Sequence, residues 1–248
     1  MRIDGTVSDS LKYPFSNNGR FLGLLALLLG SFLIIPAFFA LGYLLRIVEH
    51  TIRGYDELPA FNDWDKMFVD GLKYIGANII YLIVPTVILI VSLVGMILSV
   101  RSGNSQIVLY LFLLLIGLII SLLFNLVYIM ALGNMAHNER FGAAFEFSTI
   151  FKFIKGIGWL TYFAYVFVFF IILGILGLFF NVSLWGRIFG LAGLVVGGIL
   201  YLLFTVYRNI ARSRFTGLMY LNGYFSTNTD TEADDNHEIG ENQDFETV

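Results

Sequence analysis

Five long runs of apolar residues constrain the fold of this 248-residue chain more than any other feature. A helix needs about 20 consecutive apolar residues to cross the hydrocarbon core of a bilayer, and each run meets that length. The runs are continuously apolar, whereas the strands of a membrane β-barrel alternate between apolar and polar residues. We therefore predict an all-α fold, a polytopic helical membrane protein with about five transmembrane helices. The predicted spans cover residues 21–48, 77–100, 107–136, 157–181 and 188–207.

Composition supports a membrane protein and removes several kinds of chemistry. Hydrophobic residues make up 58% of the chain and charged residues 13%, whereas roughly a quarter of the residues in soluble proteins are charged. The chain has no cysteine, which excludes disulfides, zinc–thiolate sites and iron–sulfur clusters. It also has no zinc-protease, hydrolase, P-loop or dinucleotide-binding motif. The sequence therefore predicts no catalytic, cofactor-binding or metal-binding residue, no cofactor and no nucleic-acid partner.

The charges divide the chain into two parts. Residues 226–248 carry eight acidic side chains and no lysine or arginine, so residues 1–225 carry ten acids against fifteen bases. We predict a helical membrane domain over residues 1–225 and a disordered acidic tail over 226–248, because the tail has too few apolar residues to form a core. The excess of bases in the first part suits a surface that faces anionic lipid headgroups.

The distribution of lysine and arginine also predicts an orientation. With five spans, ten of the fifteen basic residues lie on one face, which the positive-inside rule places in the cytoplasm together with the acidic tail. The protein is then a multi-pass component of the plasma membrane with its N-terminus outside. Pro36 leaves an alternative open, because a proline in the middle of the first run interrupts its helix. If that run is a re-entrant hairpin turning at Pro36, the basic residues divide thirteen to two in favour of the cytoplasmic side.

A polar insert, residues 46–75, separates the first two spans and contains the clearest local signals. Gly54 and Pro59 end the first helix, because glycine commonly follows a helix and proline does not continue one. Asn62 occupies the position of an N-cap, and the acidic residues after it are favourable in a first helical turn. We therefore predict a new helix that begins near Asp63.

Two segments are predicted to be amphipathic interfacial helices. Apolar residues recur at i, i+3, i+4 and i+7 over residues 62–75, and a weaker copy of this pattern covers residues 140–155. A helix of this kind either lies in the plane of the lipid headgroups or packs on its own bundle. Both predicted helices fall on the cytoplasmic side of the membrane.

The insert also carries a sequence motif, GYDELPAFNDWDKMFVDGLK, which begins at Gly54. It resembles the juxtamembrane motif G-x-x-x-L-P-x-F-x-D-W of an uncharacterised family, a domain of unknown function found in multi-pass membrane proteins of archaea and bacteria. The resemblance extends from about Tyr13 to the end of the last span, and it implies an architecture and no activity. The motif positions are our candidate interfacial and partner-binding residues. They are Gly54, Leu58, Pro59, Trp64, Phe68 and Gly71.

Three classes of function remain open. We predict a non-catalytic structural, interaction or bilayer-organising component, whose partners are the lipid bilayer and a membrane or cytoplasmic protein. The alternative is a small-solute transporter or channel subunit; Ser121 and Asn125 are its central polar residues, and no span is predicted to bury a charge. The third is a lipid-modifying enzyme whose carboxylates hold a divalent cation against a lipid phosphate. Against it, Asp63, Asp65 and Asp70 are expected to face water.

Small residues in the last predicted span permit a close approach of helices. Gly190, Gly193 and Gly197 belong to two matches to the GxxxG pattern. We predict that they serve packing within the bundle. A homo-oligomer formed through the same glycines is the alternative.

Overall fold

The computed structural model describes the backbone of residues 5–102 and 106–244 and the side chains of residues 5–101 and 106–228. Every regular element in these residues is helical, which confirms the predicted all-α class. The α-helices are α1 Thr6–Lys12, α2 Asn18–Leu29, α3 Ile34–Ile52, α4 Trp64–Ser102, α5 Ile107–Asn138, α6 Phe147–Ile157, α7 Trp159–Phe179 and α8 Val182–Asp244. Short 3-10 helices lie at Tyr13–Phe15, Gly30–Phe32 and Phe141–Phe145.

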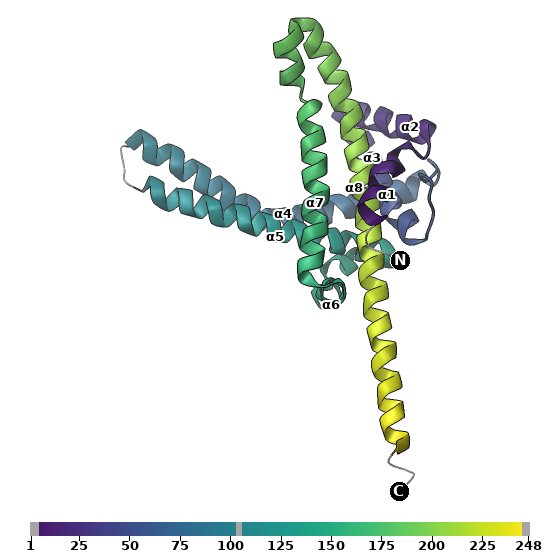
Figure 1. The fold of residues 1–248 in the computed structure, drawn as a ribbon. Helices are drawn as coiled ribbons and strands as arrows, with labels where there is room; N and C mark the ends of the chain where they lie inside the picture. Colours follow the sequence, from purple (N-terminus) through teal and green to yellow (C-terminus); the bar gives the residue numbers. More distant parts are fainter. Residues whose placement is uncertain (1–4, 103–105, 245–248) are drawn as a thin grey trace.

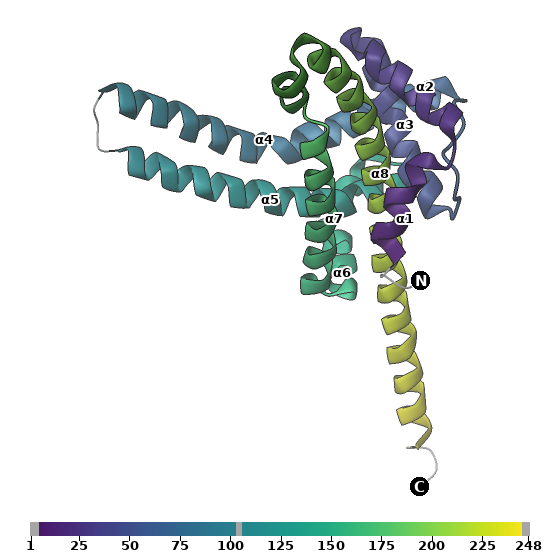
Figure 2. The ribbon, with the colours of Figure 1, turned by 45° about the horizontal axis from the view of Figure 1, so that its top comes forward.

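Two long helical hairpins leave a common hub and run across each other (Figure 1). Helices α4 and α5 form the first hairpin, and α7 with the first part of α8 forms the second. We define the hub as residues 6–78, 124–157 and 204–228. The two hairpins still diverge when the molecule is turned about the horizontal axis (Figure 2).

Four segments of the described chain are long and apolar enough to cross a membrane. They are Ile34–Ile52, Trp64–Arg101, Ile107–Asn138 and Trp159–Asn228. The last segment contains both arms of the second hairpin, because it includes α7 and the first part of α8. The protein is therefore a multi-pass integral membrane protein, and the predicted number of five spans is not confirmed.

The first hydrophobic run, residues 21–48, does not form one helix. Helix α2 ends at Leu29, a 3-10 turn follows, and α3 begins at Ile34. The two ends of the run lie together, since the Tyr13 hydroxyl donates to the backbone oxygen of Glu57 at 2.7 Å. The run is thus a hairpin of two helices, whereas the sequence predicts one continuous span. The side of the membrane on which the N-terminus lies stays a prediction.

Pro36 lies in the first turn of α3 and not at the turn of this hairpin. Proline is well tolerated in a first helical turn, where its missing N–H has no helical partner to lose. The chain reverses just before it, around Gly30, whose added Cβ would lie 3.3 Å from the Cβ of Pro36. The re-entrant alternative therefore describes the path of the chain, with the turn displaced toward the N-terminus.

Helix α4 begins at Trp64 and continues to Ser102. The predicted interfacial helix over residues 62–75 is consequently the first part of this helix and not a separate element. Its 39 residues extend about 58 Å at 1.5 Å per residue, roughly twice the thickness of a hydrocarbon core. The first turns pack on α3, where Met67 is fully buried. Part of the amphipathic face thus serves contacts within the bundle, whereas Trp64 and Leu72 of the same face remain exposed.

The second predicted interfacial helix, residues 140–155, is divided between the 3-10 helix Phe141–Phe145 and α6. Helix α6 buries Ile150 and Ile154 against the hub. It also contacts α8 closely, because a Cβ added to Gly223 would lie 2.9 Å from the Cβ of Phe153. This amphipathic helix packs on its own bundle.

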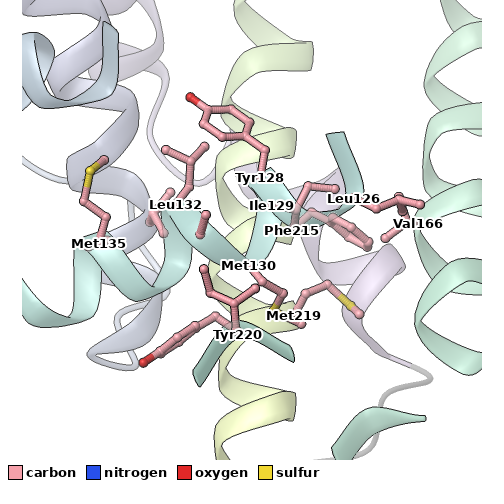
Figure 3. Close-up of a cluster of buried hydrophobic side chains, with 14 of the residues drawn as sticks. Leu126, Tyr128, Ile129, Met130, Leu132, Met135, Val166, Phe215, Met219 and Tyr220 are labelled. Atoms are coloured by element: carbon pink, nitrogen blue, oxygen red, sulfur yellow. The ribbon is translucent and has the colours of Figure 1, made fainter. Parts of the chain in front are cut away.

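The centre of the hub is the crossing of α5 and α8 (Figure 3). Buried side chains of α5, including Met130, belong to the same hydrophobic cluster as Phe215 and Tyr220 of α8. A Cβ added to Gly133 would lie 2.5 Å from the Cβ of Tyr220, so the two helices are in close contact there. Since α5 returns from the first hairpin and α8 from the second, this crossing orients the two hairpins relative to each other.

Helix α8 is interrupted at Gly190, whose φ of 60° and ψ of −139° are not helical. The short segment before this point folds back on the segment after it, because a Cβ added to Gly193 would lie 2.0 Å from the backbone oxygen of Trp185. Gly197 approaches the side chain of Trp185 in the same way. Two of the three glycines therefore serve a contact within one chain, and a homo-oligomer through Gly190, Gly193 and Gly197 stays a prediction.

The helical backbone of α8 continues to Asp244, although the sequence predicts a disordered tail from residue 226. A helix satisfies its own backbone hydrogen bonds, so it can continue past the last tertiary contact. Residues 245–248 of the predicted tail lie outside the described residues.

Candidate functional site

The candidate residues of the motif lie in and beside one loop, residues Gly54–Asp63, which we call the motif loop. Gly54 has a φ of +83°, a conformation that favours glycine, and it turns the chain out of α3. Leu58 and Pro59 are buried, whereas most other residues of the loop are exposed. The motif loop is therefore anchored by its middle and joins α3 to α4 across the surface of the hub.

Arg46 of α3 holds the C-terminal part of the motif loop. Its Nη1 donates to the backbone oxygen of Asn62 at 2.6 Å and to the Asn62 Oδ1 at 2.9 Å. It also donates to the backbone oxygens of Ala60 and Asp63, at 3.2 and 3.1 Å. Asn62 thus accepts from Arg46 and does not cap α4 as predicted, and Asp63 enters the helix with a left-handed φ of 48°.

Arg214 of α8 and Arg20 of α2 hold the N-terminal part of the motif loop. The Arg214 side chain is only 3% exposed, and its Nη1 donates to the Tyr55 backbone oxygen at 2.6 Å. Its Nη2 pairs with a carboxylate oxygen of Asp56 at 2.8 Å. Arg20 donates to the backbone oxygen of Leu58. Helices α2, α3 and α8 therefore each supply an arginine to one loop.

Two tyrosines complete the hold on the motif loop. The Tyr43 hydroxyl of α3 donates to the Pro59 backbone oxygen at 2.9 Å. Tyr13, which donates to Glu57, also lies under the Arg214 guanidinium at 4.5 Å from its ring centroid. Burial raises the pKa of Tyr13 to about 12, so its hydroxyl keeps the proton that it donates.

Gly71 marks the closest approach of α3 and α4. A Cβ added to Gly71 would lie 2.0 Å from the backbone oxygen of Phe38, and one added to Gly42 would lie 1.7 Å from that of Met67. Only hydrogen fits at both positions, so the two backbones are in direct contact. This motif glycine is explained by packing.

Trp64 and Phe68 occupy the outer side of the same crossing. Phe68 packs its ring on Phe38 and Phe39 of α3, with centroids 5.2 and 5.6 Å apart. Trp64 contacts Phe39 and Phe61, yet 47% of its surface remains exposed. Of the motif residues that follow the loop, Trp64 is thus the one that offers an aromatic surface to lipid or a partner.

A network of ion pairs joins α3, α4 and the end of α5. Lys66 Nζ lies 3.1 Å from a carboxylate oxygen of Glu49 and 3.1 Å from one of Glu139. Arg53 pairs with the same two acids, at 2.5 and 2.7 Å. The hydrogen bond from Lys66 lowers the pKa of Glu139 below its usual value. Glu139 has a left-handed φ of 53°, which ends α5 and turns its side chain into this network.

Asp70 corrects two predictions from the sequence. From the sequence we predict that Asp70 faces water and that no span buries a charge. In the structure Asp70 is only 4% exposed and pairs with Lys73 at 2.9 Å. Glu49, Arg46 and Arg214 are buried as well. Asp63 and Asp65 are exposed as expected. The packing of α4 explains the difference, because Asp70 lies beside Met135 and Ala136 of α5, while the start of α4 is at the surface.

The carboxylates do not converge on an empty metal position. Within the described part of the chain, no group of three or more histidine, aspartate or glutamate residues has the arrangement of a metal site. The buried acids Glu49 and Asp70 are instead neutralised by lysine and arginine. This arrangement fits a charge network that fastens helices to each other.

Sequence reasoning missed the three arginines that hold the motif loop. In the sequence analysis these arginines, Arg20, Arg46 and Arg214, are used only as charges that orient the protein in the membrane. Arg46 follows a long apolar run directly, which is a position where a charge needs a partner. That signal identifies a candidate, but only the folded chain shows which backbone oxygens it binds.

Comparison with protein families gives one match, over residues 29–185, to a family described as Protein of unknown function (DUF4013). The matched range includes the motif loop, Arg46 and the whole first hairpin, and it leaves out Arg20 and Arg214. It is therefore shorter than the resemblance predicted from about Tyr13 to the end of the last span. Searches of curated proteins and of solved structures gave no match. Because the match covers more than half of the chain, the protein belongs to the DUF4013 family.

Proposed function

We propose that the protein is a non-catalytic component that organises the bilayer, with the hub as a rigid anchor for two apolar hairpins. The observation that carries this proposal is the direction of the hairpins, which leave the hub across each other (Figure 1). Both expose large apolar side chains along their outer parts, such as Leu109 on α5 and Leu178 on α7. Hydrocarbon is the environment in which such surfaces are stable.

A flat bilayer does not accommodate both hairpins along its normal. The hydrocarbon core is about 30 Å thick, and α4 alone extends about 58 Å. Two hairpins that cross cannot both be parallel to the normal, so either one of them lies toward the membrane plane or the lipid surface bends around it. A protein of this shape acts on the lipid around it without any chemical step.

The charged residues of the hub support a structural role over catalysis. Glu49, Asp70 and Glu139 are each paired with a lysine or arginine of the same chain. Arg46 and Arg214 use their donors on the motif loop. These groups fasten helices together, and none of them is left poised toward a substrate cavity.

We place the hub on the cytoplasmic side of the plasma membrane. Twelve of the fifteen lysines and arginines lie within the residue ranges of the hub, whereas Arg101 and Arg187 lie near the tips of the two hairpins. The positive-inside rule favours the hub as the cytoplasmic part. A membrane or cytoplasmic protein partner would then reach the exposed ring of Trp64.

Electron cryomicroscopy of proteoliposomes tests this function. At equal protein-to-lipid ratios, the wild-type protein should shift vesicles toward smaller diameters or locally bent surfaces compared with protein-free vesicles. Gly133→Ala should weaken that shift, because its Cβ would collide with Tyr220 at the crossing that orients the hairpins. Gly174→Ala is the matched control, since its Cβ would meet nothing within 4 Å.

Two outcomes would contradict the proposal. Vesicles that contain the wild-type protein and have the same size and shape as protein-free vesicles would remove the bilayer-organising role. A steady ion conductance of the wild-type protein in planar bilayers, reduced by Asn125→Leu, would favour the channel alternative instead.

A further inference from the structure

A large apolar groove lies between α5 of the first hairpin and α7 of the second, at the border of the hub. Its volume is about 610 Å³, within the range of about 300–1,000 Å³ that is usual for sites that bind small molecules. Ser121 and Asn125 are its polar residues, and both belong to α5. The remaining lining residues are apolar, among them Leu122, Leu126, Ala164, Phe167 and Phe170.

Arg212 of α8 borders this groove at Asn125. The Arg212 Nη2 donates to the Asn125 Oδ1 at 3.3 Å, and the guanidinium lies 5.6 Å from the ring centroid of Phe170. A smaller cavity of about 90 Å³ is lined by Asn125, Arg212 and Tyr128, among other residues. Asn125 lines both cavities, so the apolar groove and a polar cavity that contains one arginine are neighbours.

The Arg212 charge is not neutralised by the chain itself, as far as the described residues show. No carboxylate among them lies within 4 Å of its guanidinium, whereas buried Arg214 has two acidic partners, Asp9 and Asp56. A guanidinium has five N–H donors in a planar fork, which matches the oxygens of a phosphate. Arg212 thus offers a positive charge and unused donors at the end of an apolar groove.

The groove also lies where the exposed part of α5 meets the packed hub. Along α5, the exposed fraction falls from 58% at Leu122 to 5% at Leu126, so Asn125 marks the border between the exposed hairpin and the packed hub. A molecule at this border meets hydrocarbon on one side and polar groups on the other. An amphiphile with an anionic head and an apolar chain fits both ends.

We propose that the groove binds an anionic phospholipid, with an acyl chain along α5 and α7 and the phosphate on Arg212. The opposite charges of phosphate and guanidinium favour this occupant over a second copy of the chain, whose hairpins offer apolar side chains and no matching anion. The site is separate from the motif loop and does not depend on the bilayer-organising role.

Native mass spectrometry of the detergent-purified protein tests the site, with dioleoyl phosphatidylglycerol and dioleoyl phosphatidylcholine as probes. The wild type should retain the anionic lipid about tenfold more strongly, as expected for a charge-assisted hydrogen bond. Arg212→Gln should abolish this preference. The matched control is Arg208→Gln, which removes an equal charge from an exposed position one turn earlier on α8 and should leave the preference intact.

Two further variants keep the test decisive if Arg212→Gln fails to fold. Asn125→Asp is nearly isosteric and would place a carboxylate beside Arg212, so it should abolish the preference as well. Ala164→Phe should reduce binding of both lipids by filling the groove, whereas Ala192→Phe, at an exposed position of α8, should not.

Three results would overturn the proposal. The first is a wild-type protein that retains both lipids equally. The second is a preference that survives both Arg212→Gln and Asn125→Asp. The third is displacement of the lipid by millimolar glycerol phosphate or inorganic phosphate, since that would identify a site for a free phosphate that makes no use of the groove.

Discussion

The hub and the two hairpins differ in what stabilises them in a membrane. The hub buries charged residues such as Arg46, Glu49 and Arg214 and gives each of them partners from the motif loop or from another helix. The outer halves of the hairpins contain almost only apolar side chains, and many of these are exposed, such as Leu109 and Leu178. The hub is therefore specified by contacts within the chain, and the hairpins are specified by the lipid around them.

From this difference we expect that the tolerance of positions to amino-acid substitution changes abruptly along a single helix. Helix α5 begins in the first hairpin with exposed leucines and ends in the hub with buried Met130 and Gly133. In the hairpin, any apolar residue of similar size is stable in contact with the lipid. In the hub, one added methyl group meets another helix.

The largest expected effect is at the crossing of α3 and α4. Gly42→Ala should lower the free energy of unfolding by about 3 kcal/mol or more, because its Cβ would lie 1.7 Å from a backbone oxygen and the helices would have to separate. Gly71→Ala should act in the same way. Unfolding in mixed micelles of a mild detergent and sodium dodecyl sulfate, followed by tryptophan fluorescence, measures both.

Gly174→Ala in α7 is the control for this comparison. Its Cβ would meet nothing within 4 Å, so the change should be neutral or stabilise the helix by about 0.5–1 kcal/mol. Equal effects of Gly42→Ala and Gly174→Ala would show that the hub is not packed more tightly than the hairpins.

The second prediction compares two apolar residues on α5. Met130→Ala should cost about 2 kcal/mol, because it leaves a cavity at the fully buried crossing with α8. The value is at the low end of the usual range, since an apolar bilayer gives little hydrophobic driving force between helices. Leu109→Ala, which is 59% exposed, should change the free energy of unfolding by less than about 0.5 kcal/mol. The same denaturation assay separates the two, and similar losses would contradict the division of α5.

The third prediction concerns the charges that hold the motif loop. Arg214→Gln should lower the free energy of unfolding by about 1–2 kcal/mol, because the Tyr55 oxygen and the carboxylates of Asp9 and Asp56 lose their donor. The loss is limited because Asp56 is exposed to solvent and stays hydrated. Limited proteolysis should also detect faster cleavage within Gly54–Asp63. Arg187→Gln, at an exposed position near the tip of the second hairpin, should change neither property.

The smallest expected effect is a pH dependence at the end of α5. The pKa of Glu139 is lowered in the folded protein, so its carboxylate stabilises the fold above its ordinary pKa of 4.5 and loses this effect as the pH falls through the folded value. Glu139→Gln should therefore be less stable than wild type at pH 7, and the difference should disappear as the pH approaches 3. A difference that stays constant over this range would exclude the ionised pair with Lys66 as its cause.

The sequence by itself determined the all-α membrane class and the positions of the long apolar helices. Hydrocarbon leaves a backbone few choices, so runs such as residues 77–100 and 107–136 have to be helical in a membrane. Local chemistry also identified Gly54 as the end of α3, because its positive φ suits glycine. These features depend on neighbours in the chain and on the solvent alone.

Only the tertiary structure decided how the helices are arranged and what the motif does. The hairpin formed by α2 and α3 depends on contacts of residues 13–20 with the motif loop, which no local pattern records. The roles of Arg20, Arg46 and Arg214 depend on backbone oxygens of the motif loop, which folding brings to these three side chains. An apolar run in the sequence predicts by itself that the segment avoids water. A buried charge needs a partner, but the packing of the whole chain decides which group that partner is.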